Sequence, residues 1–211
     1  MRVLIVTGYG DDLYTHGDAT NFFNYLVKEV GISKNRILFY GPAEYEAKIN
    51  FFNIFAQVCR QSKNDPLIIY YSGHGLSDGW SFKDNTDIPY GLLVHFLKNR
   101  NAPVMLINDC CFGMIAAEYF KELKCHKLVI GLSPKNLSGQ TDDEFGSILL
   151  PEVFKFWRRY SLAFPRFKID KKNLPEEMRD EFFYKMISHS CLRCGDGLDA
   201  LLFPQKRYEP F

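Results

Sequence analysis

The chain has 211 residues, of which 46% are hydrophobic and 16% aromatic, which is enough for one well-packed domain and too few for two ordinary ones. Its 26 basic and 25 acidic residues leave a formal net charge of +1, so no general field attracts nucleic acid or an anionic membrane. No apolar stretch approaches the roughly 18 residues of a membrane span, and no signal peptide is evident, so we expect a cytoplasmic protein.

Strand and helix patterns alternate along most of the chain. Short apolar runs predict strands at residues 3–7, 36–40, 67–71, 104–108, 127–132 and 200–203. Apolar residues at helical spacing predict helices at 19–30, 43–59, 89–97, 114–123, 145–157 and 175–188. We expect Asp18 and Gly31 to cap the first helix, and residues 76–87 to form a polar, turn-rich excursion. The alternation predicts an α/β fold with a mostly parallel sheet of about six strands and helices on both faces.

A histidine and a cysteine each follow one of the buried strands. His74 comes after 67–71 in YYSGHG, and Cys110 and Cys111 come after 104–108 in NDCCFG. The carboxyl ends of strands in an open α/β sheet face the usual ligand crevice. A thiol attacks an acyl carbon as the thiolate, so it needs a base such as histidine, which can later protonate the leaving amine. The glycines beside His74 also let backbone N–H groups approach a substrate, so the amides of Gly75 and of the nucleophile could form an oxyanion hole.

These two motifs, in this order, resemble those of the caspase-like cysteine peptidases, and they are more similar to metacaspases than to animal caspases. GDATNFFNYL (17–26) resembles the first-helix segment of that family, and FGSILL (145–150) resembles the segment after its fifth strand. The resemblance covers residues 2 to about 158 and implies a three-layer α/β/α sandwich in a single domain of residues 1–211, with a divergent part at 159–211. It assigns Cys111 as the nucleophile, His74 as its base, and the amides of Gly75 and Cys111 as the oxyanion donors.

The resemblance also bears on specificity. Asp109 stands at the position that in metacaspases belongs to an acidic pocket for Arg or Lys, and Asp18 or Asp12, with Asp11 beside it, could supply a second carboxylate. Such a pocket favours a cationic side chain. We therefore expect cleavage after Arg or Lys rather than after Asp, although Asp18 could instead simply cap its helix.

Several departures from the family pattern limit what it implies. His74 and Cys111 are 111 − 74 = 37 residues apart, against about 50 in caspases. The acidic cluster that binds Ca²⁺ in many metacaspases is reduced to Asp84 and Asp87, so we expect no cofactor and no metal site, and Ca²⁺ activation is in doubt. With no long internal linker and no prodomain, the chain resembles a minimal catalytic core. Its expected partners are a protein or peptide substrate and a regulatory protein, with the chain a monomer or a dimer.

Alternative interpretations stay open. Cys111 could be a buried structural thiol and His74 a turn-capping residue, in which case the protein would be a catalytically silent caspase-like interaction module. Cleavage after Asp, or another cysteine-dependent acyl transfer, would use the same residues. The six cysteines have no framework spacing, which favours reduced thiols. Cys191 and Cys194 form a lone CxxC that could bind zinc or act as a redox pair, and unpaired thiols are the simpler interpretation.

Overall fold

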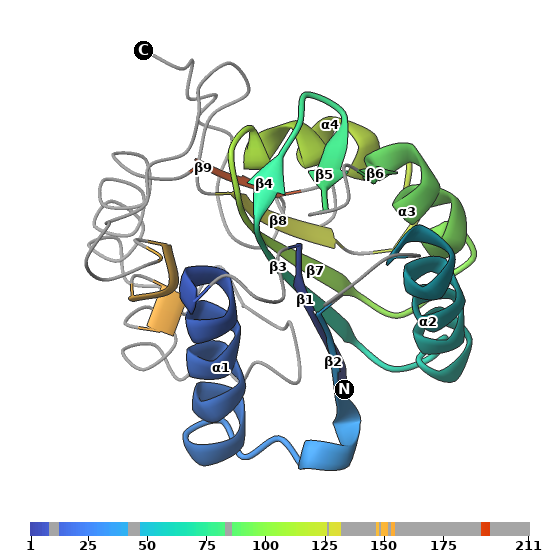
Figure 1. Cartoon of the computed structure of the whole chain (residues 1–211). Coiled ribbons are helices and arrows are strands. Elements are labelled where there is room, and N and C mark those ends of the chain that lie inside the picture. Colours follow the sequence, from blue (N-terminus) through green and yellow to red (C-terminus); the bar gives the residue numbers. More distant parts are fainter. Residues whose placement is uncertain are drawn as a thin grey trace, which may run out of the picture.

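The fold is built on a six-stranded sheet with strand order β2-β1-β3-β7-β8-β9 (Figure 1). The computed structural model describes residues 1–8, 13–41, 47–82, 86–125, 127–131, 147, 149–151, 153–154 and 191–194. The strands are β1 (Arg2–Thr7), β2 (Ile37–Tyr40), β3 (Leu67–Ser72), β7 (Val104–Asp109), β8 (Lys127–Gly131) and β9 (Cys191–Cys194). The first five are parallel, and β9 pairs antiparallel with β8. The predicted sheet of about six strands is therefore confirmed.

The sixth strand of the described sheet lies in a segment that we did not predict to form a strand, the CxxC segment Cys191–Cys194. The strand that we predicted at 200–203 lies outside the described residues. The CxxC segment holds no apolar run of strand length. Its pairing with β8 is a tertiary interaction that the local sequence pattern does not encode.

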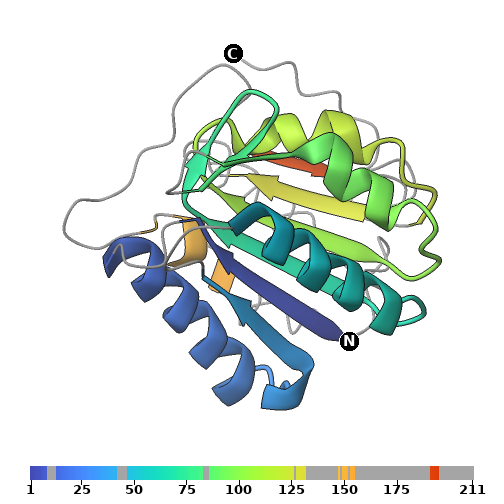
Figure 2. The ribbon, with the colours of Figure 1, turned by 45° about the vertical axis from the view of Figure 1, so that its right-hand side comes forward.

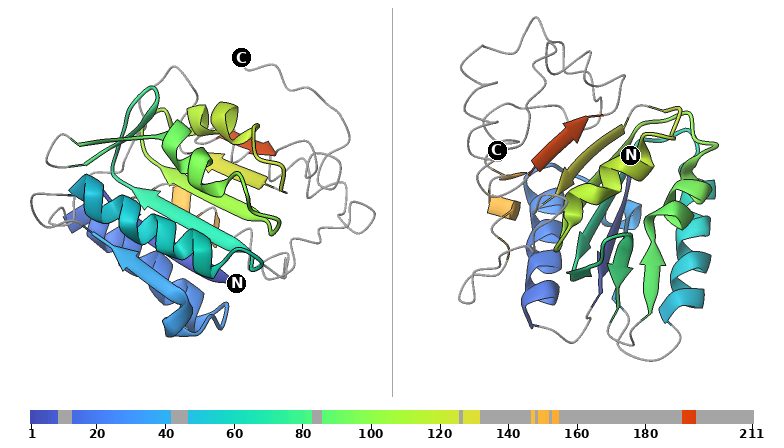
Figure 3. Two further views of the ribbon diagram at one scale, coloured as in Figure 1. Left: turned by 90° about the vertical axis from the view of Figure 1, so that its right-hand side faces the viewer. Right: turned by 90° about the horizontal axis from the view of Figure 1, so that it is seen from above.

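Helices cover both faces of the sheet, as predicted (Figure 2). One face carries α1 (Leu13–Lys28) together with the helical residues 149–151 and 153–154, and the other carries α2 (Ala47–Gln61), α3 (Tyr90–Leu97) and α4 (Ala116–Phe120). The view from above shows the three layers, with the sheet between α1 and α2 (Figure 3). Two short 3-10 helices, η1 (Lys34–Arg36) and η2 (Gly113–Ile115), complete the described helices. No helix in the described ranges combines the length and the apolar character needed to cross a bilayer.

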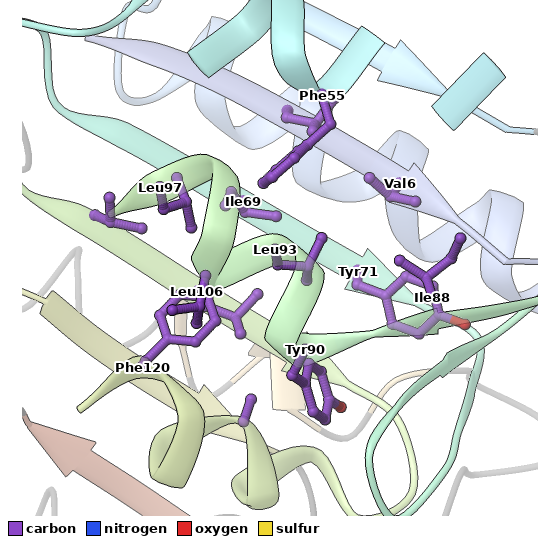
Figure 4. Close-up of a cluster of buried hydrophobic side chains, with 14 of the residues drawn as sticks. Val6, Phe55, Ile69, Tyr71, Ile88, Tyr90, Leu93, Leu97, Leu106 and Phe120 are labelled. Carbon is purple, nitrogen blue, oxygen red and sulfur yellow. The ribbon is translucent and has the colours of Figure 1, made fainter. Parts of the chain in front are cut away.

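Each face of the sheet has its own core. On the α2 side, side chains of all three helices meet those of β1, β3 and β7, and the labelled residues include Phe55, Tyr71, Leu93 and Phe120 (Figure 4). On the α1 side, Phe22 packs against Tyr70 with ring centroids 4.6 Å apart. Because both faces are covered, all six residues of β3 and of β7 are buried, which explains their mostly apolar sequences. The two strands nearest the candidate site are thus buried along their whole length.

The first helix begins earlier than its sequence indicated. α1 starts at Leu13, so Asp18 lies inside the helix and the prediction of an Asp18 N-cap is wrong. Asp18 shares a helix face with Phe22 and Tyr25, at spacings of four and seven residues, and that face is turned to the sheet. At the other end, Gly31 has φ +77° and the Ile32 N–H bonds to the Leu26 carbonyl at 2.9 Å, which confirms Gly31 as the residue that ends the helix.

A second, small sheet follows β3. It consists of three antiparallel strands, β4 (His74–Gly75), β5 (Gly79–Ser81) and β6 (Asp87–Pro89), of which β5 and the first residue of β6 fall within the polar, turn-rich excursion that we expected at 76–87. Each has two or three residues, too few for an alternating pattern to be recognised. Trp80 on β5 and Ile88 on β6 are completely buried against the α2-side core. The small sheet is therefore part of the packed structure, and its first strand, β4, carries His74.

Candidate active site

The ends of β3 and β7 bring His74 and Cys111 side by side. The two strands are parallel neighbours with Ser72 opposite Asp109, and the Gly73 N–H extends the pairing to the Asp109 carbonyl at 3.4 Å. His74 and Cys111 each follow two residues later. Adjacent strands are about 4.8 Å apart, so the register places both residues just past neighbouring strand ends, at the carboxyl edge of the sheet.

Solvent exposure distinguishes the two neighbouring cysteines. Cys111 is partly exposed and His74 is exposed, whereas Cys110 retains only 3% exposure. Burial raises the pKa of the Cys110 thiol well above its ordinary value, and the Asp109 carboxylate adds to the rise. Cys110 therefore stays protonated and enclosed. Of the two, Cys111 is the thiol that a substrate can reach.

The turn after β7 packs tightly against the backbone beside His74. A Cβ atom on Gly75 would overlap the Cys111 carbonyl oxygen and would lie 2.8 Å from the Cys110 sulfur, so only glycine fits there without movement. Phe112 has φ +54° and is the one non-glycine residue of the described chain in the left-handed region. Backbone strain of this kind concentrates at functional sites. The backbone of Gly75 therefore lies directly against the backbone of Cys111. These are the two residues whose amides we expect to donate to the oxyanion.

Asp109 and Asp18 lie on the α1 side of the sheet, and both are buried, at 5% and 7% exposure. Tyr70 donates to Asp109 Oδ2 at 2.9 Å, and the Ser147 backbone N–H donates to Asp18 Oδ1 at 3.0 Å. The Ser147 side chain also hydrogen-bonds to Asp109. Two of the three predicted substrate-binding carboxylates are thus brought together. Asp12, with Asp11, lies outside the described residues.

The environment of Asp109 perturbs its acidity. Burial raises the pKa of its carboxyl from 3.8 to about 7, and the charge of Asp18 adds to the rise, against the opposing hydrogen bonds from Ser147 and Tyr70. Asp18 also lines a cavity of about 260 Å³ together with Asn21 and Asn24 of α1 and residues of the 147–154 segment. The two carboxyls form a buried acidic pair in which the charge of Asp18 affects the ionisation of Asp109.

Asn108 is a residue of this region that sequence reasoning did not single out. It is completely buried and lies on the side of β7 opposite Asp109. The available signal was a polar residue at the same strand parity as Val104 and Leu106, where an apolar residue is expected. Its partners are 2 to 28 residues away, so the pattern alone could not identify them.

No group of three or more His, Cys, Asp or Glu side chains that could hold a metal ion occurs in the described part of the chain. Of the two acidic remnants, Asp87 is exposed on β6, and Asp84 is outside the described residues. The CxxC cysteines form β9, and the neighbouring His189 falls outside the description.

Comparisons with known proteins identify the fold. Neither a protein-family model nor a curated protein sequence matches this chain. Among solved structures, caspase-1 from Spodoptera frugiperda has a TM-score of 0.61 at 12% identity, over 99% of this chain and 91% of the caspase. The Drosophila initiator caspase Dronc has a TM-score of 0.55 at 14% identity, over 95% of this chain and 82% of Dronc. The chain therefore has a caspase-like α/β sandwich fold, while the closer relation to metacaspases stays a prediction.

Proposed function

We propose that this protein is a cysteine endopeptidase in which Cys111 is the nucleophile and His74 the general base and acid. The observation that supports the proposal is the β3–β7 register, in which the ends of the two strands that precede the exposed His74 and the partly exposed Cys111 are neighbours, while Cys110 is enclosed. The caspase fold of its structural neighbours supports this kind of chemistry. A single protein or peptide substrate would enter at the carboxyl edge of the sheet.

The proposed reaction uses only these side chains, two backbone amides and water. His74 takes the Cys111 proton, the thiolate sulfur attacks the carbonyl carbon of the scissile bond, and the amides of Gly75 and Cys111 stabilise the oxyanion. The C–N bond then breaks as His74 returns the proton to the leaving amine, which leaves a thioester on Cys111. Water, deprotonated by His74, hydrolyses that thioester and restores the thiol. Acid–base assistance of this type typically contributes 10²–10⁴-fold.

A peptide-based thiol-reactive probe tests the nucleophile directly. We expect a peptidyl acyloxymethyl ketone with a terminal Arg or Lys to label Cys111, because labelling requires both a bound peptide and an activated thiolate. Peptide mass mapping under reducing conditions identifies the modified residue. A folded protein that takes no label at Cys111 would reject the peptidase and favour a silent interaction module on the same fold.

The buried acidic pair, Asp109 and Asp18, supports a preference for a cationic side chain before the cleaved bond, with Asp12 as a further contributor. We expect fluorogenic peptides ending in Arg or Lys to have kcat/KM values at least roughly 10-fold above the matching Asp peptide, since a desolvated carboxylate attracts one charge and repels the other. Faster cleavage of the Asp peptide would overturn this specificity.

The neutral analogue citrulline provides a matched control, because it keeps the shape of arginine without the charge. The Arg-to-citrulline ratio of kcat/KM should rise from about pH 6 to about pH 8, as Asp109 loses its proton with a pKa of about 7. Any pH dependence that the two peptides share cancels in that ratio. In Asp109→Asn the rise should be absent.

A further inference from the structure

Asn108 uses its whole side-chain amide in hydrogen bonds inside the core. Its Nδ2 donates to the Gly113 carbonyl at 2.7 Å and to the Tyr90 hydroxyl oxygen at 2.8 Å. Its Oδ1 accepts from Trp80 Nε1 at 2.7 Å and from the Cys110 thiol at 3.5 Å. An amide offers two donors and two acceptor positions, so this buried side chain is fully satisfied and fixed in one orientation.

These bonds hold the turn that carries Cys111. Gly113 N–H also bonds to the Cys110 carbonyl at 3.2 Å, so the turn is closed across Cys111 and Phe112. Asn108 lies at its start and bonds to both of its ends, the Cys110 thiol and the Gly113 carbonyl. The left-handed φ of Phe112 is thus held by the surrounding bonds, as strained residues at functional sites generally are.

The same amide reaches the turn that carries His74 through Trp80. The indole of Trp80 stacks on the Tyr71 ring, with centroids 4.3 Å apart and planes within 6°. The Tyr71 hydroxyl lies 2.8 Å from the His74 carbonyl oxygen and 3.0 Å from the Ser81 carbonyl oxygen. Figure 4 shows Tyr71 and Tyr90 on this side of the sheet, beside α3 and β6. One connected set of contacts therefore spans from Gly113 to His74.

We propose that Asn108 is a positioning residue, which together with Trp80 sets the placement of the Cys111 turn relative to the His74 turn. This inference rests on the proposed function. An apolar residue would fill the same core position between Leu106 and Cys110, but it would leave Gly113, Trp80 and Tyr90 with buried polar groups lacking this partner. A buried amide of this kind fixes a single arrangement of the elements it joins.

The test compares two variants that each disturb the Asn108 amide. Asn108→Asp keeps the acceptor for Trp80 but replaces the donor that faces the Gly113 carbonyl, whereas Tyr90→Phe removes a hydroxyl that bonds to Asn108 and Cys110 and leaves the bonds of Asn108 to Gly113 and Trp80 in place. We expect Asn108→Asp to lower kcat roughly 10²-fold with KM within about 3-fold of wild type, because a misplacement on the order of 1 Å has that effect on rate. Tyr90→Phe should stay within about 3-fold in both parameters. A folded Asn108→Asp protein with wild-type kcat, or an equal loss in Tyr90→Phe, would overturn the inference.

A further variant and a substrate-free readout keep the test decisive. Trp80→Phe retains the stack on Tyr71 but lacks the indole N–H, and it should lower kcat about 10-fold with little change in KM. A wild-type kcat in Trp80→Phe would count against the inference, even when Asn108→Asp does not fold. The rate of Cys111 alkylation by iodoacetamide across pH needs no peptide substrate. If the wild-type protein cleaves no peptide, the proposed peptidase function is rejected. If the alkylation rates of wild type and Asn108→Asp coincide at every pH, the proposed positioning role of Asn108 is rejected.

Discussion

Cys111→Ala should lower kcat/KM for Arg or Lys peptides by at least roughly 10³-fold, to the background of the assay. Removing the nucleophile of an enzyme that works through a covalent intermediate leaves only binding and oxyanion stabilisation. The Cys111 side chain is only partly buried, so its truncation should change thermal stability little. Initial rates with a fluorogenic peptide, together with the melting temperature of each protein, give both quantities.

Cys110→Ala is the matched control, since it removes the same atom one residue earlier. The enclosed Cys110 thiol donates a long 3.5 Å hydrogen bond to Asn108. Its sulfur also lies 2.8 Å from the point that a Cβ atom would occupy if residue 75 were not glycine. We expect this variant to retain most of the activity and to lose roughly 1 to 2 kcal/mol of stability, which is typical for a small buried truncation. Loss of activity in Cys110→Ala with activity retained in Cys111→Ala would reverse the assignment of the nucleophile.

The sequence was sufficient for the parts of the site that lie on long, buried strands. Continuous apolar runs at 67–71 and 104–108 predicted two core strands, and the chain order then placed His74 and Cys111 just beyond their ends, as the structure has them. Such runs can be recognised because parallel strands buried on both faces need apolar residues at every position.

Features that depend on tertiary contacts could not be predicted from the sequence in the same way. The strands β4 to β6 are too short to show a period. Asp18 looked like a helix cap because capping residues are common before apolar helices, yet α1 extends past it and Asp18 binds Ser147, 129 residues away. The role of Asn108 depends on Trp80 and Tyr90 reaching it from other elements. The local sequence pattern identifies the candidate reactive residues, whereas the contacts around them come from the assembled core.

Asp109→Asn should change how the stability of the protein depends on pH. The folded state holds the Asp109 proton up to a pKa of about 7, whereas the unfolded chain releases it near 3.8. Between these values the unfolded state binds fewer protons, so the free energy of unfolding falls as pH rises. At about 1.4 kcal/mol per pKa unit, the decrease amounts to roughly 4 kcal/mol. Urea unfolding from about pH 4 to pH 8 should show this decrease in wild type relative to the variant.

Asp87→Asn is the control, because it also removes one carboxylate but at a residue that is exposed on β6. Its plot of unfolding free energy against pH should run parallel to that of wild type. If the plot for Asp109→Asn also ran parallel to that of wild type, the buried acidic pair would be contradicted. If Asp109 binds a cationic substrate side chain, as proposed, the same proton links stability to specificity. Below about pH 7 the neutral Asp109 favours the folded state, and above it the buried carboxylate disfavours the folded state while supplying the charge that would pair with such a substrate. The pH window of the stability difference should therefore coincide with that of the Arg-to-citrulline ratio, because one ionisation governs both.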